Sequence, residues 1–196
     1  MTATRTTGGP LPPLRALRYL ALGDSYTIGE GVAPGDRWPV QLAHALRGEG
    51  VMLGDPVIVA KTGWTTDELS AALDAFDADN EPAEEEALVG AASAASSSAG
   101  IEKLAAEAAP TRSKADPGAW DFVSLLIGVN NQYRGRPLDE YRTQFEALLE
   151  RAIALAGDRG GRVLVLSIPD WGVTPFARQS GRDRAQIARE LDAHNA

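Results

Sequence analysis

Short apolar segments alternate with longer amphipathic segments along this chain. The apolar segments are rich in large aliphatic residues and stop near Gly, Asp or Pro, as buried strands do. These predicted strands cover residues 18–22, 57–60, 121–127 and 162–168. Two amphipathic segments repeat their apolar residues at helical spacing and predict helices over residues 37–47 and 138–156. Two further helices are predicted over about residues 66–76 and over residues 182–196. This alternation indicates an α/β fold, in which helices cover both faces of a parallel sheet.

Two stretches interrupt the alternation. Residues 78–118 are rich in Ala, Ser and Glu and contain almost no large apolar residue. Such a composition cannot supply a core, so we interpret this stretch as an insertion or a flexible lid, with a surface helix at residues 101–109. Residues 1–16 are rich in Pro and Gly and are expected to form a flexible lead-in. Residues 17–196 then form a single domain.

Composition and charge exclude several classes of function. The chain has 196 residues and a formal net charge of -8, which opposes nucleic-acid binding because such binding depends on neutralising phosphates. It has no cysteine and only two histidines, so we expect no metal site and no cofactor. No apolar stretch approaches the ~20 residues that cross a bilayer, and the proline-rich start lacks a signal-peptide core. We therefore expect a cytoplasmic protein without membrane insertion; the sequence predicts no oligomeric state.

Candidate chemistry gathers where the predicted strands end. Ser25 follows the first strand in Gly23-Asp24-Ser25, Gly63 follows the second, and Asn130 follows the third. Because the carboxyl ends of parallel strands meet at one edge of a sheet, these three residues are predicted to converge. A serine hydroxyl can act as a nucleophile if donors stabilise the oxyanion that forms after attack on a carbonyl. Taken singly, each residue is more typical of an ordinary turn than of a catalytic site.

Three sequence blocks resemble the SGNH hydrolases, also called GDSL-type lipases and esterases. They are YLALGDSYTIGEG at residues 19–31, KTGWTTDEL at residues 61–69 and LLIGVNNQY at residues 125–133. The resemblance implies a three-layer α/β/α, flavodoxin-like fold. It also implies an enzyme that hydrolyses a carboxylic ester of a small molecule through an acyl-Ser25 intermediate. It makes Ser25 the nucleophile and assigns the oxyanion hole to the N–H groups of Ser25 and Gly63 and the amide of Asn130. Asp24 would support the site structurally, and no cofactor is implied.

The sequence departs from the family pattern in two places. Asn131 stands where many relatives have Asp, and the family's D-x-x-H block, which supplies the catalytic His, has no counterpart. His194 has D-x-H spacing with Asp192 but lies in a predicted helix, so we expect a solvated residue, as for His44. We therefore expect a truncated chain that lacks the last strand and helix. The alternative to an esterase is a non-catalytic ligand-binding or interaction domain.

Aromatic residues beside the strand ends are candidates for the substrate pocket. We predict that Trp64, Tyr133 and Trp171 bind the substrate, because each follows a predicted strand closely. Packing in the core is the alternative for both tryptophans, since large aromatic side chains bury much surface wherever they lie. Arg134 is expected to be solvated, with binding of an acidic substrate as the alternative.

Overall fold

The computed structural model describes residues 15–80 and 118–196 of the chain. The predicted insertion after residue 80, its surface helix at residues 101–109 and most of the predicted flexible lead-in lie outside these described residues. Within the two described ranges, no helix has both the length and the apolar character that crossing a bilayer requires.

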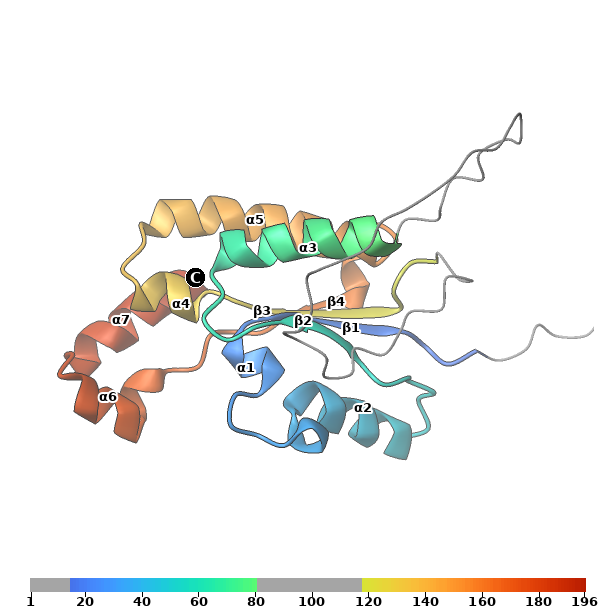
Figure 1. Cartoon of the computed structure of the whole chain (residues 1–196), viewed down its shortest axis with the longest axis horizontal. Coiled ribbons are helices and arrows are strands. Elements are labelled where there is room, and N and C mark those ends of the chain that lie inside the picture. The colour runs from blue at the N-terminus through green and yellow to red at the C-terminus, as the bar shows by residue number, and fades with distance from the viewer. Residues whose placement is uncertain (1–14, 81–117) are drawn as a thin grey trace, which may run out of the picture.

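A four-stranded parallel sheet forms the centre of the molecule (Figure 1). Its strands are β1 (Tyr19–Gly23), β2 (Val57–Ala60), β3 (Phe122–Leu126) and β4 (Val163–Val165). The strand order is β2-β1-β3-β4, and every neighbouring pair is parallel. This is the order of flavodoxin-like sheets, which bind ligands beyond the carboxyl ends of their strands.

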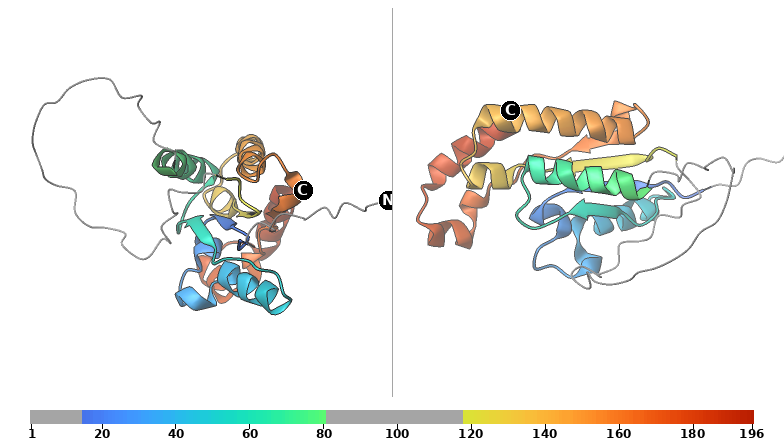
Figure 2. Two further views of the ribbon diagram at one scale, coloured as in Figure 1. Left: turned by 90° about the vertical axis from the view of Figure 1, so that its right-hand side faces the viewer. Right: turned by 45° about the horizontal axis from the view of Figure 1, so that its top comes forward.

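Helices cover both faces of the sheet, as the two views of Figure 2 show. On one face lie α3 (Thr66–Asn80) and α5 (Leu138–Leu155); on the other lies α2 (Trp38–Gly48). The side chains of β1 alternate between the faces: Leu20 and Leu22 join the core under α3 and α5, whereas Tyr19 and Ala21 join the core under α2. The predicted three-layer α/β/α, flavodoxin-like fold is therefore confirmed.

Short helices gather at the carboxyl end of the sheet (Figure 1). They are α1 (Ser25–Ile28), α4 (Val129–Tyr133), α6 (Pro175–Ser180) and α7 (Arg184–Asn195), with a 3-10 turn at Trp171–Val173. Two further 3-10 turns cover Pro34–Asp36 and Gly160–Arg162. Of these four helices, only α7 was expected from the sequence, because α1, α4 and α6 are too short to show a helical repeat.

The fourth strand is shorter than predicted. The expectation was residues 162–168, but β4 ends at Val165. The Leu166 N–H still donates to the Leu125 carbonyl at 3.0 Å, which is the last contact of the ladder. Beyond it, Ile168 donates its N–H to Asn195 Oδ1 at 2.8 Å and accepts from Asn195 Nδ2 at 3.1 Å. A side chain of α7 thus satisfies the backbone groups that a longer strand would have used.

A buried hydrogen bond between the two central strands offers a test of the core. The Tyr19 hydroxyl lies 2.9 Å from Ser124 Oγ, and both residues are fully buried. We expect Tyr19→Phe and Ser124→Ala each to lower the free energy of unfolding by about 1–2 kcal/mol, because each leaves a buried hydroxyl without its partner. The double variant should lose less free energy of unfolding than the sum of the two single losses. Urea titrations of the wild type, both single variants and the double variant would measure these losses, and strictly additive losses would contradict the prediction.

Candidate active site

The end of β1 presents Ser25 at the carboxyl edge of the sheet. Asp24 caps the short helix α1, and its Oδ1 accepts the N–H of Tyr26 at 3.0 Å. Ser25 is the first residue of that helix, so its N–H is one of those that no preceding helical carbonyl can accept. A Cβ on Gly23 would overlap the Thr27 hydroxyl, which is why a glycine must precede this turn.

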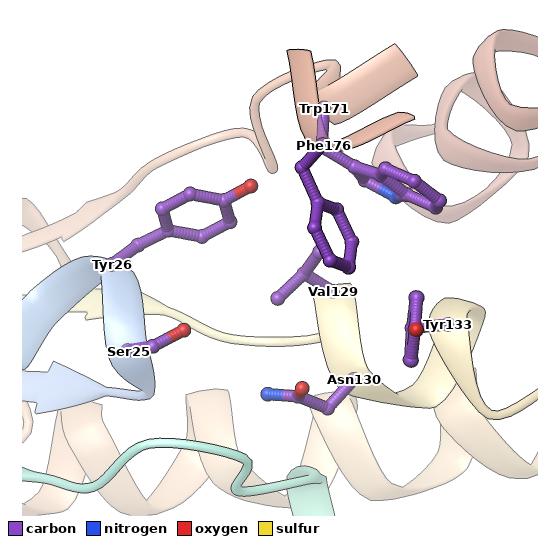
Figure 3. A pocket seen from close by; sticks show the side chains of 7 residues that line it. All are labelled: Ser25, Tyr26, Val129, Asn130, Tyr133, Trp171 and Phe176. Carbon is purple, nitrogen blue, oxygen red and sulfur yellow. The ribbon is translucent and has the colours of Figure 1, made fainter. Parts of the chain in front are cut away.

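Ser25 lines a cavity of about 270 Å³. Figure 3 shows its side chain directed into the space between α1 and α4, where the Asn130 side chain also lies. Seven residues line the cavity: Ser25, Tyr26, Val129, Asn130, Tyr133, Trp171 and Phe176. Four of the site residues expected from the sequence, Ser25, Asn130, Tyr133 and Trp171, are therefore brought together.

Gly128 and α4 position the Asn130 amide. Gly128 precedes the helix with a φ of 126°, and a Cβ there would overlap the Tyr141 ring. Asn130 Nδ2 donates to the Trp64 carbonyl at 2.8 Å. A primary amide has two N–H groups, so one hydrogen holds the side chain in place while the other can serve a ligand.

Gly63 and Trp64 lie on the loop after β2 and are not among the residues that line the cavity. Gly63 has a φ of 86°, and its carbonyl accepts from Arg134 Nη2 at 2.6 Å. Arg134 is exposed, as expected, and its guanidinium also holds this loop and forms an ion pair with Glu68 at 3.3 Å. The Trp64 side chain packs against the core under α3 and α5.

The two residues after Asn130 are fully buried and tie α4 to other helices. Asn131 Oδ1 accepts the N–H of Thr66 at 3.2 Å, and its Nδ2 donates to the Thr66 hydroxyl at 2.8 Å. Gln132 Oε1 accepts the indole N–H of Trp171 at 2.9 Å, while its Nε2 donates to Glu190 at 2.6 Å. The block that follows β3 thus fixes the first turn of α3, the Trp171 indole and α7.

Neither histidine of the sequence lines the cavity. His44 is exposed on α2, as expected. His194 is half-buried rather than solvated, because α7 packs against α5 and brings the imidazole within 4.6 Å of the Tyr141 ring. Its Nδ1 lies 2.7 Å from the Glu190 carbonyl and must carry the proton, since a carbonyl oxygen can only accept.

Sequence reasoning missed three residues of the cavity, Tyr26, Val129 and Phe176. Phe176 lies on α6, where Thr174 caps the helix, Pro175 occupies the first turn and Gly181 ends it. This Thr-Pro start and Gly stop was the signal for a short helix. Among the residues that the structure describes, no cluster of three His, Cys, Asp or Glu side chains could hold a metal ion.

Asp24 is a buried carboxyl beside Ser25. Only 1% of its surface is exposed, and Oδ2 has no hydrogen-bond partner among the described residues. Burial raises its pKa to about 6, although the backbone N–H of Tyr26 partly offsets the shift. Burial, followed by the charge of Asp24, also raises the pKa of Tyr26 and brings that of Tyr141 to about 12.

The raised pKa of Asp24 predicts a pH dependence of stability. Between its ordinary pKa of 3.8 and about 6, the folded state keeps a proton that the unfolded state has lost. The stabilisation that protonated Asp24 gives the folded state is therefore complete at low pH and is lost as the pH rises through 6. The free energy of unfolding should fall by about 2 kcal/mol between pH 4 and pH 7. Urea titrations at both pH values should show this loss in the wild type relative to Asp24→Asn. Equal pH slopes for the two proteins would contradict the prediction.

Comparison with known proteins identifies the family. The family model of the GDSL-like lipase/acylhydrolase family matches residues 21–196. No match was found among curated protein sequences. One similar solved structure is AlinE4, an SGNH-hydrolase family esterase, with 18% identity, a TM-score of 0.52, and coverage of 92% of this chain and 75% of AlinE4.

A second similar structure is TesA, with 18% identity, a TM-score of 0.52, and coverage of 90% of this chain and 68% of TesA. At this identity, both likenesses show the shared fold. The family model, which covers nearly the whole described structure, goes further: the chain belongs to the GDSL-like lipase/acylhydrolase family and is, at the level of that family, an ester hydrolase.

Proposed function

We propose that this protein hydrolyses a carboxylic ester of a small molecule, with Ser25 as the nucleophile. The observation that carries the proposal is the meeting of Ser25 and the Asn130 amide in one cavity at the carboxyl edge of a parallel sheet. A hydroxyl and an amide donor around one space supply two of the groups that attack on a carbonyl needs, the nucleophile and an oxyanion donor. Membership of the GDSL-like family supports the same reaction class.

In the proposed reaction, Ser25 Oγ attacks the ester carbonyl carbon and gives its proton to a general base. The carbonyl oxygen becomes an oxyanion, which accepts hydrogen bonds from the Ser25 N–H and from Asn130 Nδ2. The family resemblance adds the Gly63 N–H as a third donor; Gly63 lies outside the cavity lining, on the loop that Asn130 Nδ2 contacts at the Trp64 carbonyl. The C–O bond to the alcohol then breaks, the alcohol takes up a proton, and an acyl-Ser25 ester remains. Water attacks this ester, releases the acid and restores the Ser25 hydroxyl.

A second candidate function is ligand binding without turnover. One observation favours it: among the described residues, the lining of the cavity includes no histidine that could accept the Ser25 proton. The loss of one member of a serine hydrolase triad leaves only about 10³–10⁴-fold acceleration over water, from the oxyanion hole and binding. The two candidates therefore differ in whether turnover depends on Ser25.

Steady-state hydrolysis of p-nitrophenyl acetate tests the nucleophile. We expect Ser25→Ala to lower kcat by about 10³-fold or more, because no other group could form the acyl intermediate. Ser70→Ala, a serine on α3 outside the cavity, is the matched control and should retain wild-type rates. Circular dichroism would confirm that both variants fold. Equal rates in the wild type and Ser25→Ala would contradict the hydrolase and favour the binding domain.

The role of Asn130 has a separate test. We expect Asn130→Ala to lower kcat by about 10²–10³-fold with a smaller change in KM, since an oxyanion donor acts mainly in the transition state. In the Ser25→Ala background, the same substitution should have almost no further effect, because the step that it assists no longer occurs. A full additional loss in that background would show that Asn130 acts through the fold instead.

A further inference from the structure

Three aromatic rings form one wall of the Ser25 cavity. Tyr133, Trp171 and Phe176, here called the aromatic wall, come from α4, the 3-10 turn after β4 and α6 (Figure 3). Their ring centroids lie 5.5, 6.2 and 5.8 Å apart, so each ring contacts the other two. In Figure 3 the wall lies across the cavity from Ser25. A group joined to an ester carbonyl at Ser25 would therefore face this wall across the cavity.

The aromatic wall has a fixed base and an open rim. Trp171 is only 5% exposed, and the hydrogen bond from its indole N–H to Gln132 holds its orientation. Gln132 is held in turn by Glu190 of α7. By contrast, Tyr133 is 46% exposed and Phe176 is 56% exposed. Large aromatic side chains left open beside a cavity are typical of a binding surface, because a ligand can remove them from water.

The lining of the cavity is uncharged. None of its seven residues carries a formal charge. The guanidinium of Arg182 lies 5.5 Å from the ring centroids of Tyr133 and Trp171, but it also lies 3.5 Å from Glu190, which balances its charge. An anionic ligand group would therefore lose its hydration in the cavity without gaining a charged partner from the lining, whereas a neutral apolar group has no such hydration to lose.

The cavity is large enough for a ring. A closed apolar cavity of about 150 Å³ holds one benzene molecule, and this cavity has about 270 Å³. That leaves room for one six-membered ring together with the ester group at Ser25. An aromatic ring gains about 2- to 12-fold in affinity from each well-oriented aromatic neighbour, beyond the gain from its apolar area.

We propose that the aromatic wall binds an aromatic ring of the substrate, so that the preferred substrates are arylalkyl esters without an anionic group. This inference rests on the proposed function, since it assigns one substituent of the ester that Ser25 attacks. The ring can belong to the acyl group or to the alcohol, and two isomeric esters separate these sources: methyl phenylacetate carries it on the acyl side, and benzyl acetate carries it on the alcohol side.

The hydrolysis test compares each aromatic ester with its saturated analogue, methyl cyclohexylacetate or cyclohexylmethyl acetate, by pH-stat titration. We expect kcat/KM to be about 10-fold higher for one of the two aromatic esters than for its analogue. Phe176→Leu, which keeps an apolar side chain but removes a ring, should lower this ratio about 3-fold or more. Val173→Ala, an exposed apolar residue outside the cavity, should leave the ratio unchanged. A ratio near one for both pairs would overturn the proposal.

A binding test separates this inference from the hydrolase itself. Calorimetry with Ser25→Ala would measure the affinity for N-benzylacetamide and N-methylphenylacetamide, which mimic the two esters, against N-(cyclohexylmethyl)acetamide. Tighter binding of an aromatic amide, weakened by an added Phe176→Leu, supports the aromatic wall even if no ester shows Ser25-dependent turnover. No preference for either aromatic amide overturns the inference, even where Ser25-dependent hydrolysis is found.

Discussion

The close approach of chain segments at the carboxyl ends of β1 and β3 is the constraint on which the site depends. Gly23 ends β1 directly beside Leu126 of β3, and Gly128 lies against the Tyr141 ring. A side chain at either glycine would force the segments apart. Because Ser25 and Asn130 each follow one of these glycines by two residues, any such separation would also move the hydroxyl away from the amide.

Local patterns were enough to predict the layers of the fold. The strand β1 is buried on both faces and is therefore continuously apolar, while α5 has one buried and one exposed side and keeps a helical repeat. The end of β4 did not follow from such patterns. Its apolar run continues to Ile168, but the Asn195 side chain takes the backbone hydrogen bonds of Ile168, and nothing near residue 168 signals that long-range contact.

The candidate site was predictable where it follows strand ends and unpredictable where it depends on tertiary packing. Ser25 and Asn130 come directly after apolar runs, so the rule for parallel sheets brings them together. Phe176 lines the cavity because α6 brings its ring against that of Tyr133 in α4. Trp64 does not line it, because its side chain packs against the adjacent core. Whether an aromatic residue after a strand faces a ligand or the core depends on its neighbours in space. Those neighbours come from distant parts of the chain, so the local sequence does not reveal them.

Three consecutive side chains of α4 make long-range hydrogen bonds to four other residues. Asn130 reaches the Trp64 carbonyl, Asn131 reaches Thr66, and Gln132 reaches Trp171 and Glu190. Successive residues of an α-helix point about 100° apart, so neighbours in sequence can serve different parts of the molecule. The motif is contiguous for this geometric reason. Its length is therefore as constrained as its composition, because one inserted or deleted residue would rotate every later side chain away from its partner.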